Sequence, residues 1–283
     1  MEMRARLKKK MALPAIIAAV FALAFFAALA ALTEIEPFYP EASGEKIFTS
    51  MSLTMDYSHI DMGYIMLKHE GSQREMRVLI TKDKERPTQY FLIGDGEYHV
   101  YPIAHGSGRY RFDVYENMGK GFAQMMSEVI DIEIPNEFSP FVMPNLYTNY
   151  TPESQAVLKA NELFEGLTED RDKVKAAWDY VTTHIVYDFD KAAKGQELQP
   201  YFPDVDATLA EGKGVCFDYS ALFGAMLRSH GIPTQMIHGY LRAGNNPYHA
   251  WSNVYYDGEW HLMDSTYAAQ QYPDSVYVVD LVH

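Results

Sequence analysis

Residues 214–220, Gly-Val-Cys-Phe-Asp-Tyr-Ser, contain Cys216, the single cysteine of this 283-residue chain. Gly212 and Gly214 interrupt the preceding structure, and apolar residues then recur with helical spacing at Phe217, Ala221, Leu222, Ala225, Met226 and Leu227. We therefore predict Cys216 at a helix N-terminus, where the helix dipole favours an anion and a thiol forms the nucleophilic thiolate more readily. The alternative is a buried structural thiol, since free cysteine also packs as a small core residue.

A thiol nucleophile needs a base within hydrogen-bond reach, and the base needs a third group that orients it. Histidine is the usual base, and the chain between Cys216 and its last residue holds His230, His238, His249 and His261. A strand register selects among them. The dipeptide Asp257-Gly258 is typical of the centre of a two-residue hairpin turn, and it lies between two runs of strand-forming residues.

In this hairpin Tyr256 pairs with Glu259, and the same register sets Trp251 opposite Asp264. His249 shares a strand face with Trp251, because side chains alternate between the two faces of a sheet. His249 and Asp264 are then diagonal neighbours on one face, within reach of each other's side chains. The carboxylate can accept a hydrogen bond from one imidazole nitrogen and leave the other nitrogen for the thiol.

The other histidines fit this arrangement less well. His261 pairs with Val254 on the opposite face, which disfavours a contact with Asp264. His238 lies on the preceding strand and stays a candidate base. Two structural alternatives also stay open: His249 as a packed or surface histidine, and Asp264 as a turn residue that bonds the residues after it.

Cys216, His249 and Asp264 thus form a nucleophile, base and orienting-group hypothesis. A metal site is the weaker alternative, since no pair of residues has ligand spacing such as Cys-x-x-Cys or His-x-x-x-His. The acidic residues form no calcium-binding loop of the known type, and we expect no cofactor. The net charge of -14 and the lack of a basic stripe argue against a nucleic-acid partner.

The elements around these residues predict an α+β fold. Residues 46–134 hold short runs of strand formers separated by glycine-containing turns, which favours an antiparallel β-sandwich. Residues 135–150 contain three prolines and predict an extended connection at a domain boundary. Residues 151–283 form the second predicted domain, in which the helix of Cys216 is followed by strands at 235–240, 249–256, 260–264 and 276–279.

The first half of this second domain is predicted as helical. Thr151 can cap a first helix, with Pro152 at its first position. Apolar residues at steps of three and four predict a second helix over residues 174–185. Residues 187–212 are predicted as a polar loop.

Residues 1–32 have the pattern of an export signal, because basic residues precede a run from Met11 to Leu32 that contains no charged residue. The small residues Ala28-Leu29-Ala30 suit cleavage of a signal peptide. The run is also long enough to span a bilayer as an anchor with a cytoplasmic N-terminus. Either outcome predicts an extracytoplasmic protein, secreted or anchored to the cell membrane, with residues 33–45 as a linker. A single cysteine allows no internal disulfide in that setting.

The blocks Gly-Val-Cys216-Phe-Asp-Tyr-Ser, His249-Ala-Trp and Asp264-Ser-Thr occur in an order that resembles the transglutaminase-like superfamily. This resemblance covers about residues 150–270 and implies a papain-like domain with the thiol helix packed on an antiparallel sheet. It implies Cys216 as nucleophile, His249 as base and Asp264 as orienting group. Asp264-Ser-Thr departs mildly from the Asp-Pro-Thr of many members and keeps the carboxylate. Residues 46–150 resemble, more weakly, the strand-rich N-terminal part of bacterial exported members.

By this resemblance we expect an exported cysteine enzyme that attacks peptide or protein amides, with the cell envelope as one source of substrate. A thioester acyl-enzyme would be hydrolysed or transferred to an amine. The backbone N–H of Cys216 and one further donor, for which Tyr187 and Tyr201 are candidates, would hold the oxyanion. The alternative function is a catalytically silent binding or scaffold module of the envelope, since the family also contains inactive members.

Overall fold

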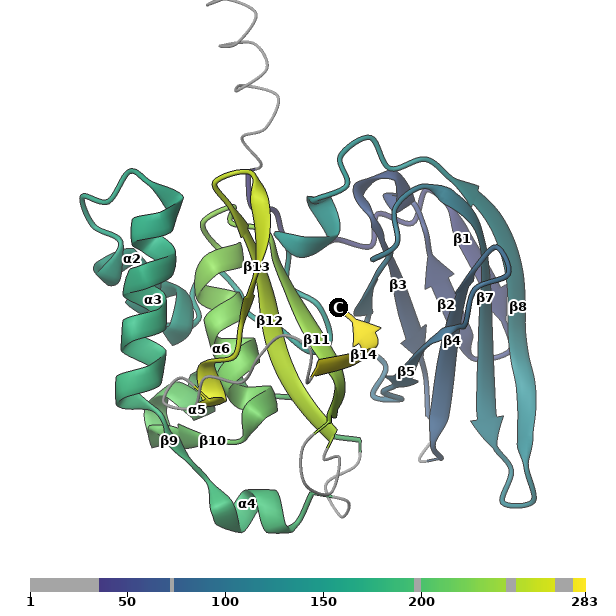
Figure 1. Cartoon of the computed structure of the whole chain (residues 1–283). Helices are drawn as coiled ribbons and strands as arrows, with labels where there is room; N and C mark the ends of the chain where they lie inside the picture. Colours follow the sequence, from purple (N-terminus) through teal and green to yellow (C-terminus); the bar gives the residue numbers. More distant parts are fainter. Residues whose placement is uncertain (1–35, 72–73, 196–199, 243–247, 268–276) are drawn as a thin grey trace, which may run out of the picture. The chain divides into compact units, whose positions relative to one another are not determined.

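The computed structural model describes residues 36–71, 74–195, 200–242, 248–267 and 277–283 (Figure 1). The predicted signal peptide or anchor over residues 1–32 lies outside these ranges. Within them, no helix combines the length and the apolar character needed to cross a membrane. Residues 37–283 form one compact unit.

The N-terminal part of this unit consists of two antiparallel four-stranded sheets. The first has the order β1-β2-β3-β6, with β1 (Ile47–Ser50), β2 (Leu53–Asp56), β3 (Tyr64–His69) and β6 (His99–Pro102). The second has the order β5-β4-β7-β8, with β5 (Thr88–Leu92), β4 (Met76–Lys82), β7 (Gly108–Asn117) and β8 (Phe122–Ile132). Buried residues of both sheets belong to one hydrophobic core, which agrees with the sandwich that the strand pattern predicts.

The strand pattern is clear in β4, where Met76, Val78 and Ile80 are buried while Arg77 and Leu79 are only half-buried. This alternation of period two places one face of the strand in the core and the other outside it. Strands β1 and β2 lie inside the predicted strand-rich region, residues 46–134, but give little periodic signal of their own. Each has four residues and contains polar Thr, Ser or Asp, which leaves too few positions for a periodic signal.

The connection over residues 135–150 is largely buried rather than a solvent-exposed linker. It contains a short 3-10 helix (Ser139–Phe141) and then the fully buried Val142 and Met143. The same core cluster includes residues of the sandwich, of this connection and of the helices that follow. The architecture changes at residues 135–150 while the hydrophobic core continues across them, and the domain boundary there stays a prediction.

Five helices and two short strands follow: α2 (Gln155–Leu163), α3 (Asp170–His184), β9 (Val186–Tyr187), α4 (Phe189–Ala193), α5 (Val205–Glu211), β10 (Lys213–Gly214) and α6 (Cys216–Arg228). The predictions of α3 and α6 are confirmed. The polar loop predicted over 187–212 is wrong, because α4 and α5 form there, each with an aspartate side chain at its N-cap. The first helix begins later than predicted: Ser154 is the N-cap of α2, and Thr151 and Pro152 lie in the turn before it.

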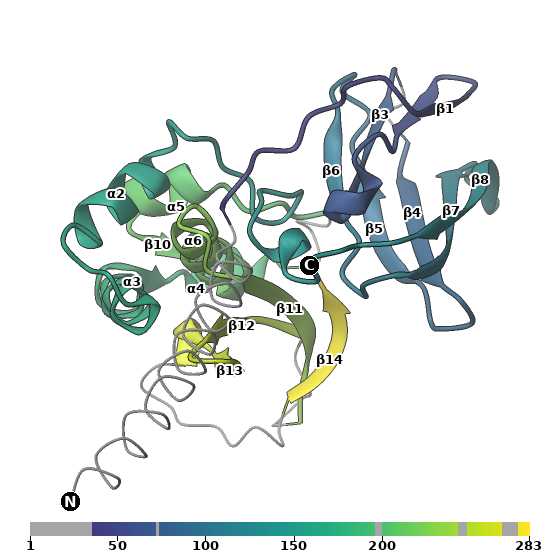
Figure 2. The same cartoon turned by 90° about the horizontal axis from the view of Figure 1, so that it is seen from above.

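Helix α6 is buried along its whole length, with Phe217 as its one residue that is not fully buried. It packs between helices α2, α3 and α5 on one side and strands β11 (Thr234–Leu241) and β12 (Tyr248–Tyr256) on the other (Figures 1 and 2). A helix in the centre of a fold is mostly apolar around its circumference, and in α6 the two charged residues, Asp218 and Arg228, lie near its ends. This arrangement agrees with the predicted thiol helix packed on an antiparallel sheet.

The sheet has the order β13-β12-β11-β14, with β13 (Glu259–Met263) and β14 (Tyr277–Val282) as its outer strands. The predicted hairpin register is confirmed, since Tyr256 pairs with Glu259 and Ser252 with Met263. Asp257 and Gly258 both have positive φ, at 55° and 85°, as a type I′ turn requires. A short 3-10 helix (Ser265–Tyr267) follows β13.

Gly239 allows three strands of this sheet to meet closely. It pairs with His249 of β12 and with Val279 of β14, where the register of β14 shifts. A Cβ atom at Gly239 would lie 2.0 Å from the carbonyl oxygen of Val278 and 2.8 Å from the ring of Trp251. Neither backbone nor buried ring can move away without cost, so the position requires glycine.

We predict that Gly239→Ala lowers the free energy of unfolding by about 3 kcal/mol or more, because overpacking at a backbone atom forces β14 to shift. Gly224→Ala in α6 is the matched control. Its Cβ would meet the Thr148 side chain at an ordinary 3.4 Å. It should change stability by less than about 1 kcal/mol, in the stabilising direction expected for a helical glycine. Urea unfolding, followed by tryptophan fluorescence, measures the free energy of unfolding of both variants. Equal losses of stability in the two variants would contradict the explanation by overpacking.

Candidate active site

Cys216 is the first residue of α6, directly after the N-cap Val215. The predicted position of the thiol at a helix N-terminus is thus confirmed. Its side chain is 7% exposed and lines a cavity of about 890 Å³. Because the first N–H groups of a helix have no partner within it, the thiol lies where backbone donors and the helix dipole favour negative charge.

His249 of β12 and Asp264, the residue after β13, lie side by side. His249 Nε2 donates a hydrogen bond to Asp264 Oδ2 at 2.6 Å, and both side chains are buried. The carboxylate also accepts from the Tyr277 hydroxyl and from the backbone N–H of Thr266, each at 3.1 Å. The bond to Thr266 is the turn contact that the structural alternative for Asp264 predicts, and it coexists with the bond to His249.

The imidazole of His249 contacts Cys216 as well as Asp264. Burial alone would lower the pKa of His249, but hydrogen bonds with Asp264 and with Cys216 outweigh burial and raise this pKa to about 9. With Nε2 committed to Asp264, Nδ1 is the nitrogen left for the thiol. The imidazole is therefore a cation at neutral pH, and a cation beside a thiol stabilises its anionic form.

The structure does not bring the other two histidines of the sheet into this group. His238 pairs with Ala250 and lies against the rings of Phe217 and His283. Burial, together with the charge of His249, lowers the pKa of His238 to about 3. His261 pairs with Val254, as the register predicts, and stacks on Tyr256.

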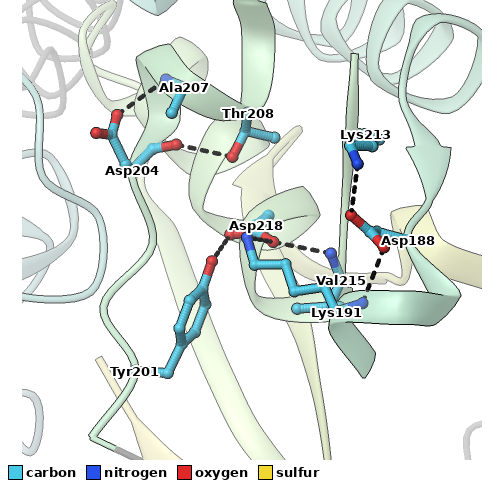
Figure 3. A network of polar contacts seen from close by, with 9 residues as sticks. All are labelled: Asp188, Lys191, Tyr201, Asp204, Ala207, Thr208, Lys213, Val215 and Asp218. Carbon is cyan, nitrogen blue, oxygen red and sulfur yellow. Dashed lines mark hydrogen bonds and ion pairs between the residues drawn. The ribbon is translucent and has the colours of Figure 1, made fainter. Parts of the chain in front are cut away.

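Tyr187 and Tyr201, the candidate oxyanion donors, both line the cavity that holds Cys216. Tyr187 belongs to β9, and its ring packs edge-on against Phe189, with ring centroids 5.0 Å apart. Tyr201 donates its hydroxyl proton to Asp218 (Figure 3). To serve an oxyanion, Tyr201 would have to redirect that proton. Their roles stay a prediction.

Asp218 was not predicted as a site residue, although it lies within the Cys216 block. Its carboxylate has no exposed surface and accepts from Val215 N–H and from Lys191 Nζ, each at 2.8 Å, as well as from Tyr201 (Figure 3). As the third residue of α6, an acidic side chain that reaches back to the N-cap is a familiar capping signal, and that signal was available in the sequence.

Lys191 neutralises the buried charge that Asp218 places near the thiol. It comes from α4, whose N-cap Asp188 accepts from the Lys191 backbone N–H at 2.9 Å. Its ammonium lies 4.8 Å from the centre of the Tyr201 ring. Asp188 also pairs with Lys213 of β10 at 3.2 Å, which joins α4 to the segment just before Cys216 (Figure 3). Among the described residues, no group of three or more histidine, cysteine or acidic side chains is arranged to hold a metal ion.

A thiol at a buried helix N-terminus, a histidine on the adjoining sheet and a carboxylate behind it agree with the predicted arrangement of Cys216, His249 and Asp264, whose catalytic roles stay a prediction. Residues 159–265 match the family model of the transglutaminase-like superfamily, so the C-terminal part of the chain contains a transglutaminase-like domain.

Individual relatives cover only parts of the chain. Mouse kyphoscoliosis peptidase is 33% identical over 132 residues, which are 41% of this chain and 19% of that protein. The chain therefore spans about a fifth of that relative. A candidate cysteine protease from Cytophaga hutchinsonii has a structure with a TM-score of 0.44 and 15% identity, over 84% of this chain and 78% of that one. Red sea bream transglutaminase has a TM-score of 0.31 and 13% identity, over 72% and 48%.

We predict that Lys191→Met lowers the free energy of unfolding by about 1–3 kcal/mol, because it leaves the buried Asp218 carboxylate without its cation. The double variant Lys191→Met/Asp218→Asn should recover part of this loss, since it removes the unpaired charge. Lys175→Met is the control, because Lys175 forms the same kind of ion pair with Asp179 on the exposed face of α3. It should cost less than about 0.5 kcal/mol. Chemical unfolding at neutral pH measures all three, and a double variant that is no more stable than Lys191→Met would contradict the pairing.

A second prediction concerns pH. The pKa of His249 is raised from 6.5 to about 9 in the fold. The stability that its protonated form contributes is therefore full below about pH 6.5 and is lost as pH rises through 9. Relative to His249→Gln, the wild-type protein should lose about 3 kcal/mol between these values. Unfolding curves from pH 6 to 9.5 measure the difference, with His184→Gln, which removes an exposed histidine of α3, as control. A constant difference would show that His249 gains no proton on folding.

Proposed function

We propose that this protein is a thiol enzyme that attacks peptide or protein amides through a thioester acyl-enzyme. The observation that carries the proposal is the position of His249, which holds hydrogen bonds with both Cys216 and Asp264 inside a buried site. The transglutaminase-like domain over residues 159–265 supports the same class of reaction.

The first half of the reaction forms the acyl-enzyme. The Cys216 thiolate attacks the amide carbonyl carbon, and the carbonyl oxygen becomes an oxyanion beside the first N–H groups of α6. Tyr187 and Tyr201, which both line the cavity of Cys216, are the candidates for a second donor, and Tyr201 would first have to give up its bond to Asp218. The C–N bond then breaks as the protonated His249 gives its proton to the leaving nitrogen, which departs as an amine or ammonia.

The second half releases the acyl group. His249, now neutral, takes a proton from water or from an acceptor amine as that nucleophile attacks the thioester carbonyl. Collapse of the tetrahedral intermediate expels the Cys216 thiolate and yields a carboxylic acid or a new amide. Asp264 holds the ring through both halves, because its bond to Nε2 keeps Nδ1 directed to the reacting atoms.

The proposal includes an extracytoplasmic site of action. Basic residues followed by the uncharged run over residues 11–32 support export, with the run cleaved or retained as an anchor. The substrates would then be peptides or proteins outside the cytoplasm, including those of the cell envelope.

The test is acylation of Cys216 by a panel of glutamine peptides and peptide anilides, followed by mass spectrometry of the intact protein. The wild-type protein should gain one acyl group, and Cys216→Ser should gain none. His249→Ala should slow acylation about 10²- to 10⁴-fold, because it removes the proton donor. His261→Ala is the control, since His261 lies on the opposite face of the same strand pair. If no donor acylates the wild-type protein and iodoacetamide alkylates Cys216 equally with and without His249, the enzyme proposal is wrong and a binding module replaces it.

A further inference from the structure

Tyr277 donates a hydrogen bond to the same oxygen of Asp264 that binds His249. Its hydroxyl lies 3.1 Å from Asp264 Oδ2, the atom that accepts from His249 Nε2 at 2.6 Å. The other carboxylate oxygen, Oδ1, accepts from the backbone N–H of Thr266 at 3.1 Å. Both oxygens of the carboxylate are therefore held, Oδ1 by the backbone that follows and Oδ2 by a tyrosine from a different strand.

Tyr277 reaches this carboxylate from the far edge of the sheet. It is the first residue of β14, whereas Asp264 follows β13, and β12 and β11 lie between these two outer strands (Figure 1). Tyr277 pairs with Leu241 of β11. His249 pairs with Gly239, two residues away from Leu241 on the same strand. Residues two apart on a strand share a face, so Tyr277 and His249 project from the same face of the sheet.

The ring of Trp251 lies against both Tyr277 and His249. Its centroid is 4.9 Å from the centroid of the Tyr277 ring and 6.2 Å from that of the His249 ring, and Trp251 is 1% exposed. Gly239 makes room for this ring, because a Cβ atom at Gly239 would lie 2.8 Å from it. Packing against a buried ring restricts the tyrosine side chain and holds its hydroxyl at the carboxylate.

Asp264 needs such donors because it is largely removed from water. It is 7% exposed, and burying a carboxylate is costly unless hydrogen bonds compensate its charge. The direction of Oδ2 also matters for the thiol site, since its bond with Nε2 leaves Nδ1 of His249 for Cys216. The torsion that turns an aspartate carboxylate has broad minima, so a carboxylate without fixed donors would hold the imidazole less firmly. Nδ1 would then face the thiol for a smaller fraction of the time.

We propose that Tyr277 is a positioning residue of the thiol site. Its hydroxyl fixes the carboxylate of Asp264, and that carboxylate in turn orients His249 toward the thiol. Tyr277 acts through Asp264 and not on the substrate, since among the described residues it does not line the cavity of Cys216. This inference rests on the proposed function for its effect on catalysis, while the support that His249 gives to the thiolate can be measured without a substrate.

The first test removes only the hydroxyl, with Tyr277→Phe. For the donors of the acylation assay, kcat should fall about 5- to 20-fold, part of the effect of a hydrogen bond to a charged group, and KM should stay within about twofold. Tyr110→Phe is the matched control, because the Tyr110 hydroxyl donates to the carbonyl oxygen of Gly106 at 2.7 Å in the sandwich. It should lose stability and keep the wild-type kcat. An unchanged kcat in Tyr277→Phe would overturn the proposal.

A double-variant comparison separates positioning from packing. If Tyr277 acts through Asp264, its hydroxyl should no longer matter once the carboxylate is gone. Tyr277→Phe should therefore lower kcat by less than about twofold in the Asp264→Ala background. An equal fold-loss in both backgrounds would show that the hydroxyl acts elsewhere and would contradict the assignment. Circular dichroism checks that each variant is folded, and if Asp264→Ala is not, the effects of Tyr277→Phe on kcat and KM decide.

Failure of this assignment can be separated from failure of the enzyme proposal. Alkylation of Cys216 by iodoacetamide needs no substrate, and its rate reports how well the imidazolium supports the thiolate. At pH 6, Tyr277→Phe should react at least about threefold more slowly than the wild-type protein, and the two rates should converge near about pH 9.5, where a free thiol ionises without help.

Tyr110→Phe should match the wild-type protein at both pH values. Equal rates of Tyr277→Phe and the wild-type protein at pH 6 would overturn the positioning role, even if donors acylate Cys216. Slower alkylation of Tyr277→Phe at pH 6 would support the role, even if no donor acylates the protein and the proposed function fails.

Discussion

The burial of α6 on every side is the constraint on which the rest of this structure depends. A helix that lies in the centre of the fold must have its unpaired terminal N–H groups satisfied without help from bulk water. Asp218 meets part of this requirement at the first turn by accepting from Val215 N–H, while Lys191 compensates its charge and Tyr201 donates a further hydrogen bond to it. These contacts fix Cys216 at the wall of the cavity. The hydrogen-bond donors beside it could not be replaced by apolar residues.

A buried charged residue also holds the other end of α6. Arg228 has no exposed surface and donates to the carbonyl oxygens of Thr234, Met143 and His283, at 2.8, 3.1 and 2.9 Å. Burial lowers the pKa of Arg228 to about 10, so it stays charged at neutral pH. One guanidinium thus ties α6 to β11, to the connection after the sandwich and to the residue after β14. This is a physical reason why the sandwich and the helices and sheet that follow it share one core.

Sequence reasoning succeeded where the relevant interaction is local. The turn at Asp257-Gly258 determines the register of β12 on β13, and that register alone brought His249 and Asp264 to one face. The same reasoning identified the start of α6, because glycines precede it and apolar spacing follows it. Helices α4 and α5 were missed although their capping residues, Asp188 and Asp204, were visible, since each helix is too short to show a periodic pattern.

Contacts between segments that are far apart in the chain leave no such local pattern in the sequence. The bond from Tyr201 to Asp218 joins a loop to a helix, and the ion pair from Arg86 to Asp280 joins the sandwich to β14. Both depend on how whole elements pack, which composition and periodicity do not specify. A cavity of about 320 Å³ beside the one that holds Cys216 has the same origin: residues of β4, β5, α6, β11, β12, β14 and of the loops between elements line it, and no single stretch of sequence contains it.

The arrangement of charges favours a catalytic role of this site over a purely structural one. Asp218, His249 and Asp264 are all buried around one thiol, and removing charges from water is costly even when they are paired. Apolar residues of similar size would fill the same space with equal or greater stability. A scaffold gains nothing from a buried imidazole whose pKa lies near 9, whereas a thiol enzyme needs an imidazolium beside its nucleophile and a carboxylate to orient it. The acyl-transfer proposal therefore gives a reason for the free-energy cost of burying these charges. A catalytically silent binding module gives none.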